Sequence, residues 1–168
     1  MKISIITVSY NSENFIESCI NSIISQSYKN IEYIIIDGSS KDNTLKIIKK
    51  YSRHVSTIVS EPDEGIYDAM NKGLRIASGE IIGFLHSDDI YENEDILSKV
   101  VNVFKNNASL DACYADLIYV KKTNISRIVR YWKSNKFTRG SFSKGWSPPH
   151  PTVFVRRSVY ERYGNFNL

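Results

Sequence analysis

The sequence predicts an α/β fold with a mainly parallel sheet flanked by helices. Short apolar runs rich in β-branched residues alternate with segments whose apolar residues recur at helical spacing. Polar or turn-forming residues follow each of these runs, as is typical of strands that end at one edge of such a sheet. The chain has 168 residues, of which 42% are hydrophobic, and this suffices for a core. We therefore expect one domain over residues 1–168.

Strands and helices are expected to alternate over the first 120 residues. Ser12 is the expected N-cap of the first helix, and Gly79 is expected just beyond the end of the third. Farther on we expect a strand over 128–132, an irregular loop over 134–149 and a helix over 157–163. The strands of the alternating part are predicted over residues 2–9, 31–36, 55–59, 81–85 and about 112–120. Its helices are predicted over residues 15–24, 45–51, 66–77 and about 95–105.

The polar ends of the predicted strands indicate where a ligand binds. In open parallel sheets, ligands bind outside the carboxyl ends of the strands. This rule selects four segments as one rim, namely residues 7–11, 37–42, 61–65 and 86–89. We therefore expect the functional site to be assembled from these segments.

Two common nucleotide-binding signatures are absent. No G-x-G-x-x-G follows the first strand, and the glycines at 140 and 145 are followed by Trp146 where a P-loop has Lys and Ser or Thr. The sequence therefore disfavours hydride transfer with a dinucleotide and phosphoryl transfer on a P-loop.

Asp88 and Asp89 stand side by side after a very apolar run. Adjacent carboxylates repel each other unless a cation compensates them, and hard oxygen ligands suit Mg²⁺ or Mn²⁺ shared with substrate phosphates. The pair therefore favours a divalent metal and a phosphate-bearing substrate. The alternative is that both residues merely cap the next helix.

The charge is distributed unevenly. Residues 1–116 hold 17 acids and 11 bases, whereas residues 117–168 hold 1 acid and 11 bases interleaved with aromatic residues. Such a segment favours an anionic partner, whether nucleic acid, a phosphate-bearing substrate or an acidic membrane surface. The alternative is a solvated Lys-rich face. Nucleic acid is the weakest of these, because no RNA-binding motif or recognition helix accompanies the charge.

Four motifs in order resemble those of family 2 glycosyltransferases with the GT-A fold. T-V-S-Y-N at 7–11 is similar to the family's opening T-V-x-Y-N, and D-G-S-S-K-D-N-T at 37–44 is similar to its D-G-S-S-D-x-T segment. E-P-D-E-G-I-Y-D-A-M-N-K-G at 61–73 resembles the donor-side segment, and S-D-D at 87–89 resembles the metal motif. The resemblance extends over the whole chain and corresponds to the N-terminal, donor-binding part of the family.

The resemblance implies a role for each matched residue. Tyr10 would flank the base, Asp37 would accept from the uracil imide, Asp88 would hold the ribose, and Asp89 would bind Mn²⁺ or Mg²⁺ at the diphosphate. The implied donor is a nucleotide-diphosphate sugar, expected to be UDP-linked. The residues implied to bind it are Thr7, Ser9, Tyr10, Asn11, Asp37, Asp63, Asn71, Lys72 and Asp88.

Transfer to an acceptor hydroxyl needs a general base within hydrogen-bond reach. The sequence offers Asp116, the last acid before Glu161, and His150, which lies where similar enzymes often read H-Q-[ST]. Pro151 departs from that pattern, and the two candidates remain open. The family implies an inverting displacement, and the expected acceptor is a saccharide or a polyprenyl-diphosphate-linked saccharide.

The two parts of the chain are expected to differ in function. We expect residues 1–116 to form the donor half and residues 117–168 to form a basic acceptor half. The acceptor half is expected to be truncated, because relatives continue past a segment that commonly reads G-G-F-D. In this chain the similar segment ends with Asn167 in place of the acid. We expect a cytoplasmic protein with peripheral membrane contact through residues 121–144, and two reduced thiols, Cys19 and Cys113. The alternative function is a non-catalytic nucleotide-binding or interaction module.

Overall fold

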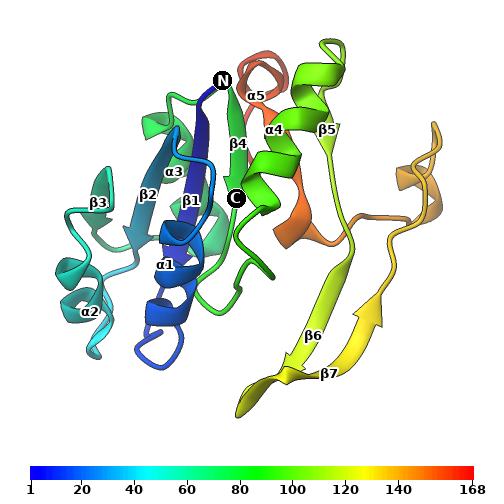
Figure 1. The fold of residues 1–168 in the computed structure, drawn as a ribbon. Coiled ribbons are helices and arrows are strands. Elements are labelled where there is room, and N and C mark those ends of the chain that lie inside the picture. Colours follow the sequence, from blue (N-terminus) through cyan, green and yellow to red (C-terminus); the bar gives the residue numbers. More distant parts are fainter.

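The computed structural model describes residues 1–168 and contains a six-stranded sheet and a two-stranded sheet (Figure 1). The strand order of the large sheet is β3-β2-β1-β4-β8-β5, in which β3, β2, β1 and β4 are parallel and β8 is antiparallel to both of its neighbours. This confirms the predicted mainly parallel α/β fold. The strands are β1 (Ile3–Ser9), β2 (Ile31–Asp37), β3 (Thr57–Ser60), β4 (Ile81–Phe84), β5 (Ala112–Cys113) and β8 (Phe154–Arg156).

Helices cover both faces of the large sheet. One core cluster joins α1, α2 and α4 to one face, and a second joins α3 and α5 to the other. None of the helices combines the length and the apolar character that crossing a bilayer requires. The helices are α1 (Ile16–Ile24), α2 (Thr44–Lys50), α3 (Ile66–Ile76), α4 (Ile96–Asn106) and α5 (Arg157–Tyr163), with 3₁₀ turns η1 (Phe142–Lys144) and η2 (His150–Thr152).

Strand β1 shows why the sheet needs two helical layers. Alternate residues of a strand point to opposite faces. Ile3 and Ile5 belong to the first core cluster, whereas Ile6 and Val8 belong to the second, and all four are buried. Each such side chain contributes about 1.5–3 kcal/mol on burial. A strand that is apolar on both faces is therefore stable only between two layers.

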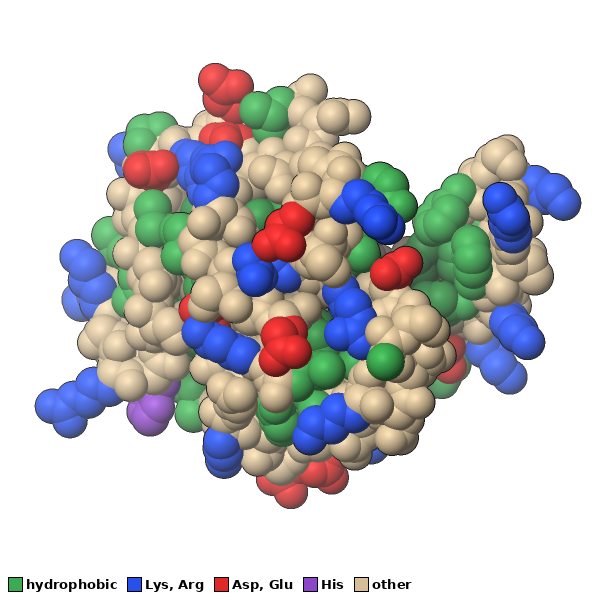
Figure 2. Space-filling model, turned by 90° about the horizontal axis from the view of Figure 1, so that it is seen from above, with side chains coloured by type: hydrophobic (Ala, Val, Ile, Leu, Met, Phe, Trp, Pro, Cys, Tyr) green, Lys and Arg blue, Asp and Glu red, His purple; other side chains and the backbone are tan.

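The second sheet is a hairpin of β6 (Leu117–Lys121) and β7 (Asn124–Trp132). Together with the irregular segment that follows, it forms what we call the β6–β7 lobe, residues 117–149. This lobe projects from the edge of the large sheet (Figure 1), and part of it stands apart from the body when the molecule is seen from above (Figure 2).

The structure corrects the expectation of one strand over residues 112–120. The chain leaves the large sheet after β5 and pairs again only from Leu117. The side chains of Ser134 and Thr152 both donate to the Ala115 carbonyl, and the Thr152 hydroxyl also accepts from the Ala115 amide. These side chains take the place of a strand partner. Strand β8 was not predicted, because three residues are too few for a periodic pattern.

Two expected caps, at Ser12 and Gly79, are also wrong, and the alternative that Asp88 and Asp89 cap the next helix is excluded. The hydroxyl of Ser12 does not cap α1, whose N-cap is Phe15, and Asp88 and Asp89 do not cap α4, which begins after Asp95. Gly79 does not adopt a left-handed conformation. It is needed for close packing, because a Cβ there would lie 2.5 Å from the amide nitrogen of Ser4.

Candidate active site

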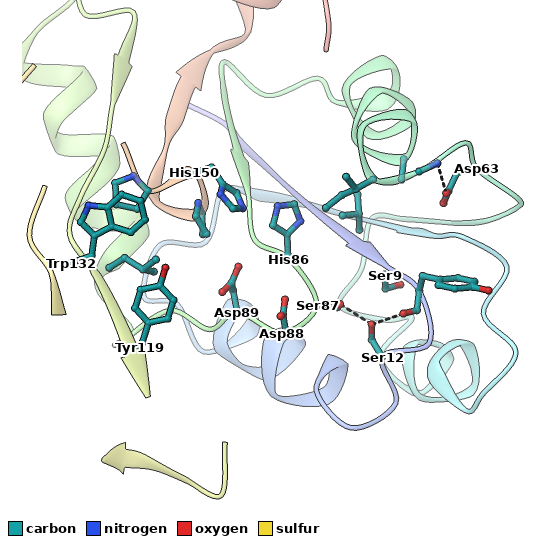
Figure 3. Close-up of a pocket in the computed structure, with 18 residues that line it drawn as sticks. Ser9, Ser12, Asp63, His86, Ser87, Asp88, Asp89, Tyr119, Trp132 and His150 are labelled. Atoms are coloured by element: carbon teal, nitrogen blue, oxygen red, sulfur yellow. Dashed lines mark hydrogen bonds between the residues drawn. The ribbon is translucent and has the colours of Figure 1, made fainter. Parts of the chain in front are cut away.

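A cavity of about 610 Å³ opens at the carboxyl ends of β1 and β4. It is lined by the ends of these strands, the loop before α3, the inner side of the β6–β7 hairpin and turn η2 (Figure 3). A volume of this size suits a nucleotide or a sugar nucleotide. Of the predicted site residues, six line it: Ser9, Tyr10, Asp63, Asp88, Asp89 and His150.

Asp88 and Asp89 lie at the floor of the cavity, directly after β4. A turn in which the Asp89 amide donates to the His86 carbonyl at 3.0 Å places both side chains toward the cavity. Asp88 is exposed and Asp89 half-buried. Burial, reinforced by the charge of Asp88, raises the pKa of Asp89 to about 6. The site therefore holds an unfavourable concentration of negative charge.

This charge fits a divalent cation. No ion pair involves either carboxylate, and the chain brings together no group of three or more His, Cys, Asp or Glu side chains that could hold a metal by itself. A metal ion bound at Asp89 would therefore take its remaining oxygen ligands from water and substrate phosphates, as Mg²⁺ and Mn²⁺ commonly do.

Tyr10 and Asp63 form the other end of the cavity. The Tyr10 side chain is 61% exposed although it follows a fully buried strand. Gly38 lies between the two, since a Cβ there would overlap the Asp63 carboxylate and touch the Tyr10 ring at 3.4 Å. The missing side chain at Gly38 leaves an exposed aromatic face beside a carboxylate, a surface suited to a flat base.

Two hydroxyl groups join the strand ends beneath the cavity. Ser12 Oγ lies 2.8 Å from Ser87 Oγ and donates to the Tyr10 carbonyl at 3.1 Å (Figure 3). The loop after β1 is thereby tied to the loop that carries the two aspartates. Neither serine was predicted as a site residue, because their contact spans 75 positions of the chain.

Asp37, Thr7 and Asn11 lie outside the cavity lining. Asp37 has no exposed surface and accepts hydrogen bonds from Ser9, Ser40 and Ser60. Thr7 is buried, and its hydroxyl accepts from Tyr33 at 3.2 Å. Asn11 adopts a left-handed conformation, with φ of 47°, and accepts from the Lys41 amide. Thr7 thus joins β1 to β2, whereas Asp37 and Asn11 hold the loops in place. The predicted contacts of all three with a nucleotide stay predictions.

Asn71 and Lys72 of α3 also lie outside the lining. Asn71 exchanges two hydrogen bonds with the backbone of Phe166, at 2.9 and 3.0 Å. Lys72 forms ion pairs with Glu61 at 3.1 Å and Asp68 at 3.3 Å. Asn71 thus anchors the C-terminal segment to α3, and Lys72 braces the loop before α3. Their predicted contacts with the diphosphate or sugar likewise stay predictions.

The structure separates the two candidates for the general base. His150 is exposed and lines the cavity near Asp89 (Figure 3). Asp116 does not line it, and its carboxylate accepts from Tyr131 Oη at 2.6 Å and from the Ser134 amide at 2.7 Å. These hydrogen bonds lower the pKa of Asp116. A carboxylate held in this way is a weak base, so the geometry favours His150.

His86 is a cavity residue to which the sequence assigned no role. It is 7% exposed, its Nδ1 has no hydrogen-bond partner, and its ring centroid lies 5.2 Å from that of His150. Burial, followed by the charge of His150, lowers the pKa of His86. The imidazole is therefore neutral near pH 7. The only sequence feature that could have identified His86 as a site residue was its position in the predicted rim, close to Asp88 and Asp89.

The fold and the cavity together define a class of protein. The mainly parallel six-stranded sheet flanked by helices matches the fold of GT-A glycosyltransferases. The sequence pattern of glycosyl transferase family 2 matches residues 4–164, and the chain belongs to that family.

Curated relatives extend beyond this chain. The PGL/p-HBAD biosynthesis glycosyltransferase of Mycobacterium tuberculosis is 30% identical over 168 residues, which are 98% of this chain and 63% of that protein. The UDP-Glc:alpha-D-GlcNAc-diphosphoundecaprenol beta-1,3-glucosyltransferase WfgD of Escherichia coli is 36% identical over 108 residues, which are 64% of this chain and 43% of that protein. The chain thus spans less than two thirds of these relatives.

Solved structures share the fold. The mannosyltransferase PcManGT of Pyrobaculum calidifontis, in complex with GDP-Man and Mn²⁺, has a TM-score of 0.75 at 22% identity, covering 99% of this chain and 47% of that one. TarS of S. aureus, in complex with UDP-GlcNAc, has a TM-score of 0.71 at 22% identity, covering 96% of this chain and 47% of that one.

Proposed function

We propose that the chain binds a UDP-sugar and takes part in transferring the sugar to a saccharide or a polyprenyl-diphosphate-linked acceptor, in the synthesis of cell-surface polysaccharide. The observation that carries the proposal is the cavity in which Asp88 and Asp89 share one open space with Tyr10 and Asp63. The names of the relatives support the same class, since WfgD uses UDP-Glc and a diphosphoundecaprenol-linked acceptor.

The donor is proposed to lie across the cavity floor. Tyr10 flanks the base beside Gly38, Asp88 binds the ribose hydroxyls, and Asp89 holds a divalent cation at the diphosphate. The cation, when bound, neutralises the charge that develops on the leaving diphosphate. PcManGT, which has the same fold, was crystallised with Mn²⁺ and a nucleotide sugar, and this supports the assignment.

The acceptor is proposed to enter from the side of the β6–β7 hairpin. Leu117, Tyr119 and Trp132 line this side, with His150 next to them. His150 removes the proton of the acceptor hydroxyl as its oxygen attacks the anomeric carbon and UDP leaves, which inverts the configuration. We propose the same division into a donor half, residues 1–116, and an acceptor half, residues 117–168, and the cavity lining supports it.

The test is nucleotide binding followed by turnover. UDP with Mn²⁺ is expected to raise the thermal unfolding midpoint of the chain, and UDP alone or GDP with Mn²⁺ to raise it less. Release of UDP from UDP-sugars then separates an enzyme from a non-catalytic nucleotide-binding module. Equal responses to UDP with and without Mn²⁺ would contradict the metal-assisted donor site.

A further inference from the structure

The β6–β7 lobe, residues 117–149, has one face that the cavity does not use. Leu117, Tyr119 and Trp132 turn toward the cavity. Because side chains alternate along a strand, Ile118 and its pairing partner Tyr131 point the other way. No core cluster includes any residue of the lobe, and Tyr131 on this outer face is 55% exposed.

The lobe concentrates the exposed apolar surface of the chain. It holds half of the large hydrophobic side chains that are exposed, and Val129 is 67% and Ile125 62% exposed. Exposed apolar side chains gathered in one part of a chain favour association with a membrane or another molecule. These exposed side chains are Val120, Ile125, Ile128, Val129, Tyr131, Phe137 and Phe142, together with Tyr119, which lines the cavity.

The charge of the lobe indicates which partner it fits. It contains eight Lys and Arg residues and no Asp or Glu. None of the eight forms an ion pair. Figure 2 shows Lys and Arg side chains on the outward side of the projecting part of the lobe and a hydrophobic surface on its side turned toward the body. These bases are Lys121, Lys122, Arg127, Arg130, Lys133, Lys136, Arg139 and Lys144.

We propose that the outer face of the β6–β7 lobe docks on an anionic lipid bilayer. Lysine and arginine attract anionic headgroups, and aromatic side chains favour the membrane interface. The aliphatic side chains of Ile125, Ile128 and Val129 have no counterpart on a nucleic acid, whereas the acyl region beneath the headgroups accommodates them. The occupant that matches both features is therefore a lipid surface.

Docking in this way gives the proposed acceptor a route to the cavity. The inner side of the same hairpin lines the cavity, so only the thickness of the hairpin separates a bilayer on its outer side from the cavity. A lipid-linked diphosphate could then reach His150 while its chain stays in the membrane. This consequence rests on the proposed acceptor, whereas lipid binding itself is measured without donor or acceptor.

The test is sedimentation with vesicles. The chain is expected to bind vesicles of phosphatidylcholine with about one third phosphatidylglycerol, and not phosphatidylcholine alone, at about 0.1 M salt. Replacing Arg127, Lys136 and Arg139 by Gln removes three exposed cations that form no hydrogen bond or ion pair. Each cation near an anionic surface strengthens binding about fivefold, so this variant should bind roughly 100-fold more weakly.

The matched control removes the same charge elsewhere. Lys46, Lys49 and Lys50 lie exposed on α2, at the opposite end of the large sheet (Figure 1), and replacing them by Gln should change vesicle binding less than about threefold. Far-UV circular dichroism verifies that both variants fold.

Three results would overturn the proposal. These are equal binding to neutral vesicles, an equal loss in both variants, or a concentration-dependent dimer that Ile128→Ser and Val129→Ser abolish while vesicle binding persists. The last result would assign the face to a second copy of the chain. UDP binding is measured on the same samples, so failure of lipid docking and failure of the donor site are distinguishable.

Discussion

Replacing Asp89 by Asn separates the electrostatic cost of the site from its function. Burial and the charge of Asp88 raise the pKa of Asp89 from an ordinary 3.8 to about 6. A rise of roughly two units corresponds to about 3 kcal/mol, which partial exposure reduces to about 2 kcal/mol. This is the cost, in free energy of unfolding, of keeping the carboxylate ionised without a cation.

The sign of the effect follows from the direction of the shift. Because the folded protein holds the proton more tightly than the unfolded chain, stability falls as the pH rises from about 4 through about 6. Asp89→Asn should therefore stabilise the metal-free chain by about 2 kcal/mol at about pH 7, and much less near pH 4. Urea unfolding at both pH values measures the difference. Asp111→Asn, an exposed control, should change stability by less than about 0.5 kcal/mol.

The same variant should lose its response to metal. With UDP and Mn²⁺ at about ten times the dissociation constant, the wild-type chain should gain about 1.4 kcal/mol, and Asp89→Asn should gain almost none. Stabilisation of the apo chain together with loss of ligand response is the signature of a functional charge. The reasoning fails if Asp89→Asn lowers the free energy of unfolding of the metal-free chain at neutral pH, or if it raises that free energy equally near pH 4 and near pH 7.

Three further changes test other parts of the structure. Burial alone would raise the pKa of Glu32, but hydrogen bonds from neighbouring lysine and serine groups lower it to about 2. Glu32→Gln should therefore lower the free energy of unfolding in urea by about 2 kcal/mol at neutral pH. This loss should disappear as the pH falls from about 4.5 to about 2. Gly38→Ala should weaken UDP binding about tenfold in calorimetry, because the new Cβ displaces the Asp63 carboxylate. The free energy of unfolding should change by less than about 1 kcal/mol. An unchanged affinity for UDP would contradict the proposed site for the nucleotide base. His150→Ala should lower the turnover rate at least about 100-fold without changing the affinity for UDP. Asp116→Asn should lower the turnover rate less than about threefold. The reverse order of the two effects would identify Asp116 as the general base.

Local patterns in the sequence predicted much of the fold. The parallel strands β1, β2, β3 and β4, and the helices between them, lie within a few residues of their predicted positions. Apolar periodicity is a direct consequence of burial between two helical layers, so it is readable without a structure. The expectation that polar strand ends share one rim was also useful, because five of the predicted site residues in the four rim segments line one cavity.

Contacts between distant residues could not be read from the sequence. The pairing of Asn71 with Phe166 joins positions 95 apart, and the Ser12–Ser87 contact joins positions 75 apart. The complete burial of Asp37 depends on Ser9 and Ser60, which come from other strands. Such contacts leave no periodic pattern in the chain.

By itself, the sequence determined which segments are buried strands, which polar residues follow them, and that the second half is basic, because each of these properties depends on residues close together in the chain. The tertiary structure alone decided that His150 joins Tyr10 and Asp89 in one cavity, that Asp116 is held outside it, and that β8 enters the large sheet antiparallel. The physical reason is that these outcomes depend on how strand ends and loops from distant parts of the chain pack against one another.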